Sequence, residues 1–215
     1  MGERSGVARS AGCLTSALVR SAVLVPIKGF GGAKVRLAGA LDHAGRVQLA
    51  RQMAAQVLSA ASPLPVAVAC DDEDVAAFAL EHGAVVLWTP GLGLNGAVTE
   101  AVERLAADGY DEVVVAHADL PMAAGIAAVA GAEDTVTLVP DRHDDGTNVL
   151  AIPSTSGFVF AYGPGSFARH RAEAERLGLL VRVVRDARLG WDVDTPADLD
   201  VPADLGPPAL GPLPC

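Results

Sequence analysis

Short, continuously apolar stretches recur along this chain, and segments with helical periodicity separate them. Val23–Pro26 and Glu112–Ala116 are two such stretches, and Gly45–Ser59 is an amphipathic segment between them. Apolar strands that alternate with helices are typical of a mostly parallel sheet that is covered on both faces. The pattern therefore predicts an α/β protein, with a Rossmann-like, mostly parallel sheet and helices on both faces.

The expected elements run through most of the chain. The expected strands are Val23–Pro26, Val66–Cys70, Val85–Trp88, Glu112–Ala116, Val136–Pro140, Val149–Ile152 and Val181–Arg185. The expected helices are Gly45–Ser59, Val75–Glu81, Leu94–Ala107 and Ser166–Leu177. In sheets of this kind ligands bind beyond the carboxyl ends of the strands, so the loops that follow the strands are the first candidates for a site.

The length of the chain and the composition of its two ends suggest one domain with a disordered segment at each terminus. The chain has 215 residues, which is enough for one sizeable core. Residues 1–20 contain arginines but no continuous apolar stretch, so we expect a disordered extension and no signal peptide. Residues 201–215 are rich in Pro, Gly and Leu, which predicts a flexible tail. The domain is expected over residues 21–200.

Composition excludes several classes of protein. The formal net charge of −10 argues against a nucleic-acid partner, because binding phosphates requires a basic face. No unbroken apolar run reaches the roughly 18–20 residues of a membrane span. The cysteines are Cys13, Cys70 and Cys215, whose spacing indicates neither a metal site nor a disulfide framework. A cytoplasmic location is the simplest expectation.

The first candidate site is the loop "PIKGFGGAKVRL" after the first expected strand. It holds both lysines of the chain, Lys28 and Lys34, together with Arg36. Its glycines are Gly29, Gly31 and Gly32. Glycines allow close approach to a ligand and positive φ, and the amide groups and cations of such a loop can stabilise a triphosphate. The alternative is a flexible turn with solvated cations, but the absence of other lysines favours a functional loop.

Carboxylates follow later strands. Asp119 of "HADLP" comes directly after a buried strand, where an α/β enzyme holds Mg²⁺, although it could instead cap the next helix. In "WDVDTPADL", alternation along a strand predicts that Asp192 and Asp194 point to one side. Thr195 and Pro196 form a helix start that Asp194 could support, so Asp192 is the better ligand. Mg²⁺ favours one or two carboxylates plus substrate phosphates, which Asp119 and Asp192 would supply.

The chain resembles a known family in several stretches that occur in register. These are "VPIKGFGGAKVRL", "GLGLNGAV", "HADLP", "DGTNVL", "YGPGSFARH" and "DVDTPADL". The order is similar to that in the guanylyltransferases that make phospholactyl or phosphoenolpyruvyl guanosine diphosphate for coenzyme F420. They belong to the wider group that includes the molybdenum-cofactor guanylyltransferases. The resemblance covers about residues 22–200 and implies a nucleotidyltransferase (nucleotide-diphospho-sugar transferase-like) fold. Val35 departs from it, because the family has a small hydroxyl residue there.

The resemblance implies a role for each matching residue. Lys28, Lys34 and Arg36 would hold the GTP phosphates, and Asp119 and Asp192 would hold Mg²⁺. The residues implied to lie beside the nucleotide are Gly31, Gly32, Leu94, Asn95 and Gly96. The phosphorylated acid would be bound by Thr147, Gly163 and Ser166. A Gly-Pro-Gly turn before a helix capped by Ser166 also offers free amide groups to an anion, though an ordinary helix start fits as well.

The implied reaction moves GMP from GTP to a three-carbon phosphorylated acid and releases pyrophosphate. The alanine-rich, arginine-over-lysine composition suggests a GC-rich genome. If the host is an actinobacterium, the resemblance implies phosphoenolpyruvate as acceptor, which is therefore favoured; 2-phospho-L-lactate comes next. The resemblance is also compatible with a homodimer and implies that the product passes to the next enzyme of coenzyme F420 assembly. Alternatives are a nucleotidyltransferase for a molybdopterin or sugar phosphate, or a non-catalytic nucleotide-binding regulator. An NAD-dependent oxidoreductase is disfavoured because the glycine fingerprint is absent.

Overall fold

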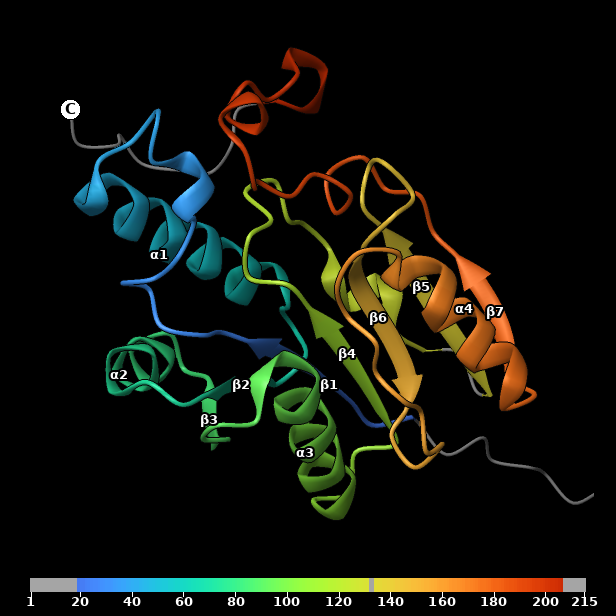
Figure 1. Cartoon of the computed structure of the whole chain (residues 1–215). Helices are drawn as coiled ribbons and strands as arrows, with labels where there is room; N and C mark the ends of the chain where they lie inside the picture. The colour runs from blue at the N-terminus through green and yellow to red at the C-terminus, as the bar shows by residue number, and fades with distance from the viewer. Residues whose placement is uncertain (1–18, 132–133, 207–215) are drawn as a thin grey trace, which may run out of the picture.

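One twisted sheet organises the part of the chain that the computed structural model describes, residues 19–131 and 134–206. Within these residues its seven strands lie in the order β3-β2-β1-β4-β6-β5-β7 (Figure 1). The strands are β1 (Ser21–Pro26), β2 (Val66–Cys70), β3 (Val85–Trp88), β4 (Glu112–Ala116), β5 (Thr135–Pro140), β6 (Thr147–Pro153) and β7 (Leu180–Val183). The α-helices are α1 (His43–Ala60), α2 (Glu73–Glu81), α3 (Gly93–Ala107) and α4 (Ser166–Arg176).

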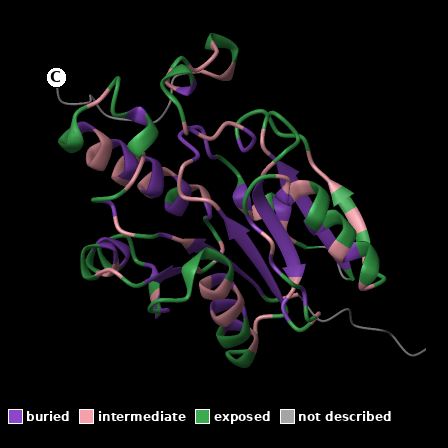
Figure 2. Cartoon of the chain, in the orientation of Figure 1, coloured by how far each residue is buried: buried purple, intermediate pink, exposed green. Residues whose placement is uncertain are grey.

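The sheet is mostly parallel, as predicted. β1 pairs in parallel with β2 and β4, β2 with β3, and β5 with β7. Only β6 runs against its neighbours β4 and β5 within the described chain, because residues 141–146 form a short turn between β5 and β6. The central strands are buried along their length, whereas β7 at the edge is largely exposed (Figure 2).

Helices cover both faces of the sheet, which confirms the predicted layers. On one face α1 and α2 pack against the strands through residues such as Val57 and Phe78. On the other face α3 and α4 do so through residues such as Val98 and Ala174. Because strand residues alternate, β1 sends Val23 to the first core and Leu24 to the second.

The predicted element boundaries are close to those observed. The strands expected over Val66–Cys70, Val85–Trp88 and Glu112–Ala116 are confirmed as they stand. The last strand is shorter than expected and ends at Val183 rather than Arg185. The expected extension over residues 1–20 and tail over 201–215 lie mostly outside the described residues. Of the tail, a single 3₁₀ turn at Ala203–Leu205 is described. No described helix is long and apolar enough to cross a membrane.

Candidate active site

An open cleft of about 1190 Å³ lies at the carboxyl ends of the parallel strands. Its walls come from the loop after β1, the acidic turn after β2, the start of α3, and the segment after β4. This is the edge of the sheet where the crossover connections leave room for a ligand. The candidate phosphate loop and one of the candidate metal ligands, Asp119, therefore face the same space.

The loop after β1 approaches the acidic turn closely at Gly29. A Cβ atom at this position would lie 2.7 Å from a carboxylate oxygen of Asp72. The other carboxylate oxygen of Asp72 accepts hydrogen bonds from the backbone of Asp74 and Val75 and so caps α2. Asp72 cannot move away without uncapping α2, so residue 29 has to be small.

The loop glycines do not use the positive φ that glycine allows. Gly29, Gly31 and Gly32 are absent from the described residues with positive φ, and the residue in this loop that has it is Lys34, with φ of 55°. A non-glycine residue in this left-handed region is uncommon and needs compensating contacts. Lys34 has them through its side chain.

The ammonium group of Lys34 joins two acidic segments. Its Nζ atom lies 2.7 Å from Oδ2 of Asp119 and 3.0 Å from Oδ1 of Asp194. Arg36 is farther out, with a guanidinium nitrogen 3.7 Å from the other oxygen of Asp194. Lys28 lines the same cleft. The structure thus brings Lys34 and Arg36 to the carboxylates that follow β4 and precede the 3₁₀ turn Pro196–Leu199, with Lys28 in the wall of the same cleft.

The pair of Lys34 and Asp119 is held in its charged form. Burial opposes the charge on Lys34, but Asp119 and Asp194 outweigh burial and raise its pKa. Burial likewise disfavours charge on Asp119, but Lys34 first and then His117 lower its pKa. The second oxygen of Asp119, Oδ1, is buried and has no hydrogen-bond partner in the described part of the chain. An ionised oxygen of this kind is costly unless it meets a further donor or cation.

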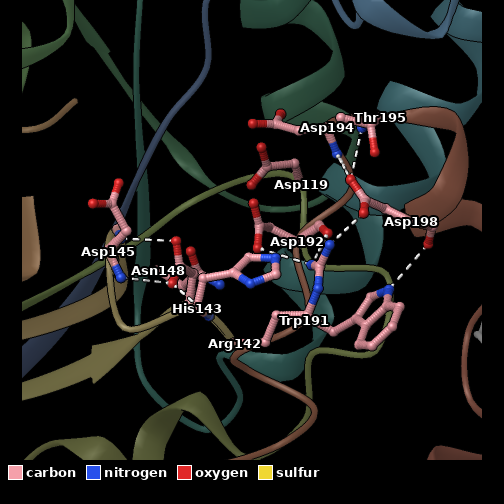
Figure 3. Close-up of polar contacts among 12 residues, drawn as sticks. Asp119, Arg142, His143, Asp145, Asn148, Trp191, Asp192, Asp194, Thr195 and Asp198 are labelled. Carbon is pink, nitrogen blue, oxygen red and sulfur yellow. Dashed lines mark hydrogen bonds and ion pairs between the residues drawn. The ribbon is translucent and has the colours of Figure 1, made fainter. Parts of the chain in front are cut away.

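Asp192 lies beside Asp119, but its pKa shifts in the opposite direction (Figure 3). Burial raises its pKa, and repulsion from Asp119 and Asp194 adds to the effect. The expected strand around it is wrong, because residues 191–194 form an irregular segment. Asp192 contacts Arg142 at 3.5 Å, whereas Asp194 contacts Lys34 and Arg36. The two carboxylates therefore do not share one partner.

The residues present fit a divalent cation. Within residues 19–131 and 134–206, no three His, Cys, Asp or Glu side chains are already arranged as a metal site. However, Asp119 has a buried oxygen that meets no hydrogen-bond partner among the described residues, and the pKa of Asp192 is raised partly by repulsion from Asp119. Hard oxygen donors of this type suit Mg²⁺, which uses few protein carboxylates and takes its remaining ligands from phosphates and water.

The three residues expected to bind the acid do not line the cleft. Thr147 is buried at the start of β6, where its hydroxyl lies 3.0 Å from Nδ1 of His170. Gly163 lies in the turn before α4 and has φ of +120°. Ser166 is the first residue of α4 and is buried, so its predicted role as N-cap is wrong; Gly165 takes that position with φ of 72°. Their role toward an acid stays a prediction.

The residues expected beside the nucleoside fall into two groups. Gly32 and Leu94 line the cleft. Asn95 instead fastens the segment before α4, because its Oδ1 accepts a 2.7 Å hydrogen bond from the backbone N–H of Tyr162. Gly96 sits inside α3 next to Leu92, and Gly31 lies in open space. Neither Gly31, Asn95 nor Gly96 is part of the cleft lining.

Sequence reasoning missed two groups of this site. Asp194, which the sequence indicates only as support for a helix start, is an ion-pair partner of Lys34. Arg142, in the turn between β5 and β6, is not among the residues that the sequence indicates, and it contacts both Asp192 and Asp198. The sequence Thr-Pro-Ala-Asp does indicate the helix start at this place, because Thr195 and Asp198 form a capping box there.

Solved structures with a similar arrangement show the fold of this chain. The fold is similar to that of a nucleotidyl transferase from Methanothermobacter (TM-score 0.60, 14% identity, 84% of this chain and 94% of that one). It is also similar to 4-diphosphocytidyl-2C-methyl-D-erythritol synthase (TM-score 0.57, 13% identity, 86% and 96%). The predicted nucleotidyltransferase fold is confirmed.

Sequence comparison gives the family within that class. The family model "Guanylyl transferase CofC like" matches residues 21–201, and the chain belongs to this family. A phosphoenolpyruvate guanylyltransferase of Sphaerobacter thermophilus is 36% identical over 182 residues, which cover 81% of this chain and 88% of that protein. A protein of the same name from Conexibacter woesei is 37% identical over 184 residues, covering 80% and 82%.

Proposed function

We propose that this protein transfers GMP from GTP to the phosphate of phosphoenolpyruvate and releases pyrophosphate. The observation that carries the proposal is the meeting of Lys34 with Asp119 and Asp194 in the cleft, beside Lys28 and Arg36. A cationic loop suits the phosphates of a nucleoside triphosphate, and carboxylates opposite it suit a divalent cation. Together they suit a triphosphate with its bound cation. The names of the similar proteins support the choice of donor and acceptor.

The proposed chemistry needs no protein nucleophile. An oxygen of the acceptor phosphate, already ionised at neutral pH, attacks the α-phosphorus of GTP, and the bond to the bridging oxygen of the β-phosphate breaks. Lys28, Lys34 and Arg36 stabilise the negative charge of the departing pyrophosphate. Asp119 and Asp192 would hold Mg²⁺, which supplies charge neutralisation when bound. Thr147, Gly163 and Ser166 are proposed to orient the acid.

The biological setting is part of the same proposal. The product, an enolpyruvyl guanosine diphosphate, would pass to the next enzyme of coenzyme F420 assembly in the cytoplasm. The domain over residues 21–200 would be sufficient for the reaction. We also propose that the protein can form a homodimer, as the resemblance allows.

The test is pyrophosphate release from GTP and Mg²⁺ with one acid at a time. We expect the fastest release with phosphoenolpyruvate, a slower one with 2-phospho-L-lactate and the slowest with 3-phosphoglycerate, with the guanylylated acid identified by mass. ATP in place of GTP should be a poor donor. Equal or faster release with 2-phospho-L-lactate would overturn the choice of acceptor, and no release with any acid would overturn the function.

A further inference from the structure

Arg142 lies outside the cleft but touches the segment that carries the acidic groups. It sits in the turn between β5 and β6, and its backbone N–H donates a 2.9 Å hydrogen bond to the carbonyl of Gly190. It is not among the residues that line the cleft. Any effect of Arg142 on the proposed reaction would therefore act through its neighbours.

The segment from Trp191 to Asp194 needs side-chain contacts to hold its shape. It belongs to no strand or helix, so no ladder of backbone hydrogen bonds fixes it. One backbone contact ties it to the segment after β4, from the N–H of Val193 to the carbonyl of Asp119 at 3.2 Å, and a second, from the N–H of Trp191 to the carbonyl of Arg188 at 3.4 Å, is local. An irregular segment with so few backbone bonds samples several positions unless other groups restrain it.

The guanidinium group of Arg142 supplies such restraints on both sides of this segment (Figure 3). One nitrogen donates to the backbone carbonyl of Asp192 at 3.0 Å and lies 3.5 Å from its carboxylate. The other end pairs with the carboxylate of Asp198, which is 7% exposed. The planar group also stacks on the ring of Trp191, 4.4 Å from its centroid.

Asp198 extends the restraint from Arg142 to Asp194. Its Oδ2 atom accepts hydrogen bonds from the backbone N–H groups of Asp194 at 2.8 Å and Thr195 at 2.6 Å. Its backbone carbonyl accepts from the indole of Trp191 at 3.0 Å. Through these bonds one arginine is linked to the backbone of both Asp192 and Asp194, the two acidic residues that accompany Asp119.

We propose that Arg142 is a positioning residue that sets where Asp192 and Asp194 stand relative to Asp119, and thereby sets the affinity of this cluster for a divalent cation. The inference rests on the proposed function for its role in the reaction. Its physical content, cation affinity, can be measured without nucleotide or acid. A planar fork with several donors is needed for three simultaneous contacts, so lysine cannot replace it.

The variant Arg142→Lys tests the proposal, with Arg182→Lys as matched control. Arg182 on β7 also makes two hydrogen bonds through its guanidinium group, but it donates to the hydroxyl of Thr137 and the carbonyl of Val129, away from the acidic segment. Mn²⁺ binding to the nucleotide-free protein is measured by electron paramagnetic resonance. We expect Arg142→Lys to weaken Mn²⁺ binding by roughly 10- to 100-fold, as other changes behind metal ligands do, and Arg182→Lys to leave it unchanged.

A second readout follows the segment itself. The chain has two tryptophans, so Trp88→Phe leaves Trp191 as the only one. In this background Arg142→Lys should increase acrylamide quenching of Trp191, and Arg182→Lys should not. In turnover assays Arg142→Lys should raise the apparent KM for Mg²⁺ while kcat at saturating Mg²⁺ falls less.

Each outcome decides the inference. Wild-type Mn²⁺ affinity in folded Arg142→Lys would overturn it, and so would a wild-type protein that binds no Mn²⁺ at millimolar concentration. If Arg142→Lys fails to fold, Asp198→Asn breaks the same ion pair while keeping an oxygen for the backbone of Asp194, and unchanged Mn²⁺ affinity there would overturn the inference. Absence of pyrophosphate release, with the Mn²⁺ effect present, would refute the proposed function alone.

Discussion

Lys34 and Asp119 are 85 positions apart in the chain, yet the ammonium nitrogen of one lies 2.7 Å from a carboxylate oxygen of the other. The side chains are only 12% and 24% exposed. The contact joins the loop after β1 to the segment after β4, two strands that are neighbours in the sheet. The cation of Lys34 thus balances Asp119, one of the two carboxylates that are proposed to hold Mg²⁺, and the neighbouring Asp194.

Removing the charge of Lys34 should destabilise the protein and make it depend on a divalent cation. Lys34→Met leaves Asp119 buried without its cation, which should cost about 2 kcal/mol of unfolding free energy. Because Mg²⁺ can replace the missing charge, added Mg²⁺ should raise the melting temperature of Lys34→Met more than that of the wild type. Thermal denaturation with and without Mg²⁺ measures both effects.

Arg36→Met is the matched control for this prediction. The Arg36 side chain is 76% exposed and its ion pair with Asp194 is long at 3.7 Å, so its loss should have little effect on stability. If Mg²⁺ raises the melting temperatures of Lys34→Met and the wild type equally, Lys34 does not balance the proposed cation site.

Neutral replacement of either proposed metal ligand should abolish turnover without unfolding the protein. Asp119→Asn and Asp192→Asn keep the shape of each side chain, and we expect pyrophosphate release to fall by on the order of 10²-fold or more. Asp74→Asn is the control, because Asp74 pairs with Arg51 on α1 and has no contact with Asp119 or Asp192. Near wild-type rates in either variant would remove that carboxylate from the metal site.

The fold could be predicted because its determinants are local. Each buried strand is a short apolar run, and Asp72 after Cys70 marks the start of α2, where its side chain caps the helix. The antiparallel direction of β6 was not predicted, because direction depends on the turn at residues 141–146 and not on the apolar pattern.

The site was predictable only where a residue type was itself unusual. Two lysines in one loop indicated the cationic side, and Asp119 after a buried strand indicated the acidic side. The pairing of Lys34 with Asp194 could not be read from sequence, since it depends on how an irregular segment folds back over the sheet. Arg142 was missed for the same reason: its partners lie about 50 positions away.

Asn95 should contribute to stability through the segment before α4. Its amide accepts from the backbone N–H of Tyr162 at 2.7 Å and donates to the same residue's carbonyl at 3.4 Å. Asn95→Ala leaves these groups without their partner, so we expect a loss of about 1–3 kcal/mol in chemical denaturation. Thr99→Ala, one turn further along α3, removes only an exposed bond to the helix backbone and should cost less.

The same pair of variants tests the predicted nucleoside contact of Asn95. If Asn95 acts only on the segment before α4, Asn95→Ala should leave the KM for GTP close to that of Thr99→Ala. A selective rise in the KM for GTP in Asn95→Ala would assign it to the nucleotide as well.

His170 should make the protein less stable at mildly acidic pH. The ring is fully buried, and its Nε2 atom accepts a 3.0 Å hydrogen bond from the backbone of Ala161, so the neutral form carries its proton on Nδ1, beside Thr147. Burial first, and then the charges of Arg169 and His117, lower the pKa of His170 from 6.5 to about 4.

The stabilising effect of neutral His170 is therefore complete above pH 6.5 and is lost as the pH falls toward 4, because the unfolded chain takes up a proton in this range and the folded protein does not. The loss should reach about 3 kcal/mol near pH 4. His170→Gln, compared with the exposed His43→Gln, should flatten the fall in unfolding free energy between pH 6.5 and 4 that urea denaturation measures in the wild type. An unchanged slope in His170→Gln would show that His170 does not cause the acid sensitivity.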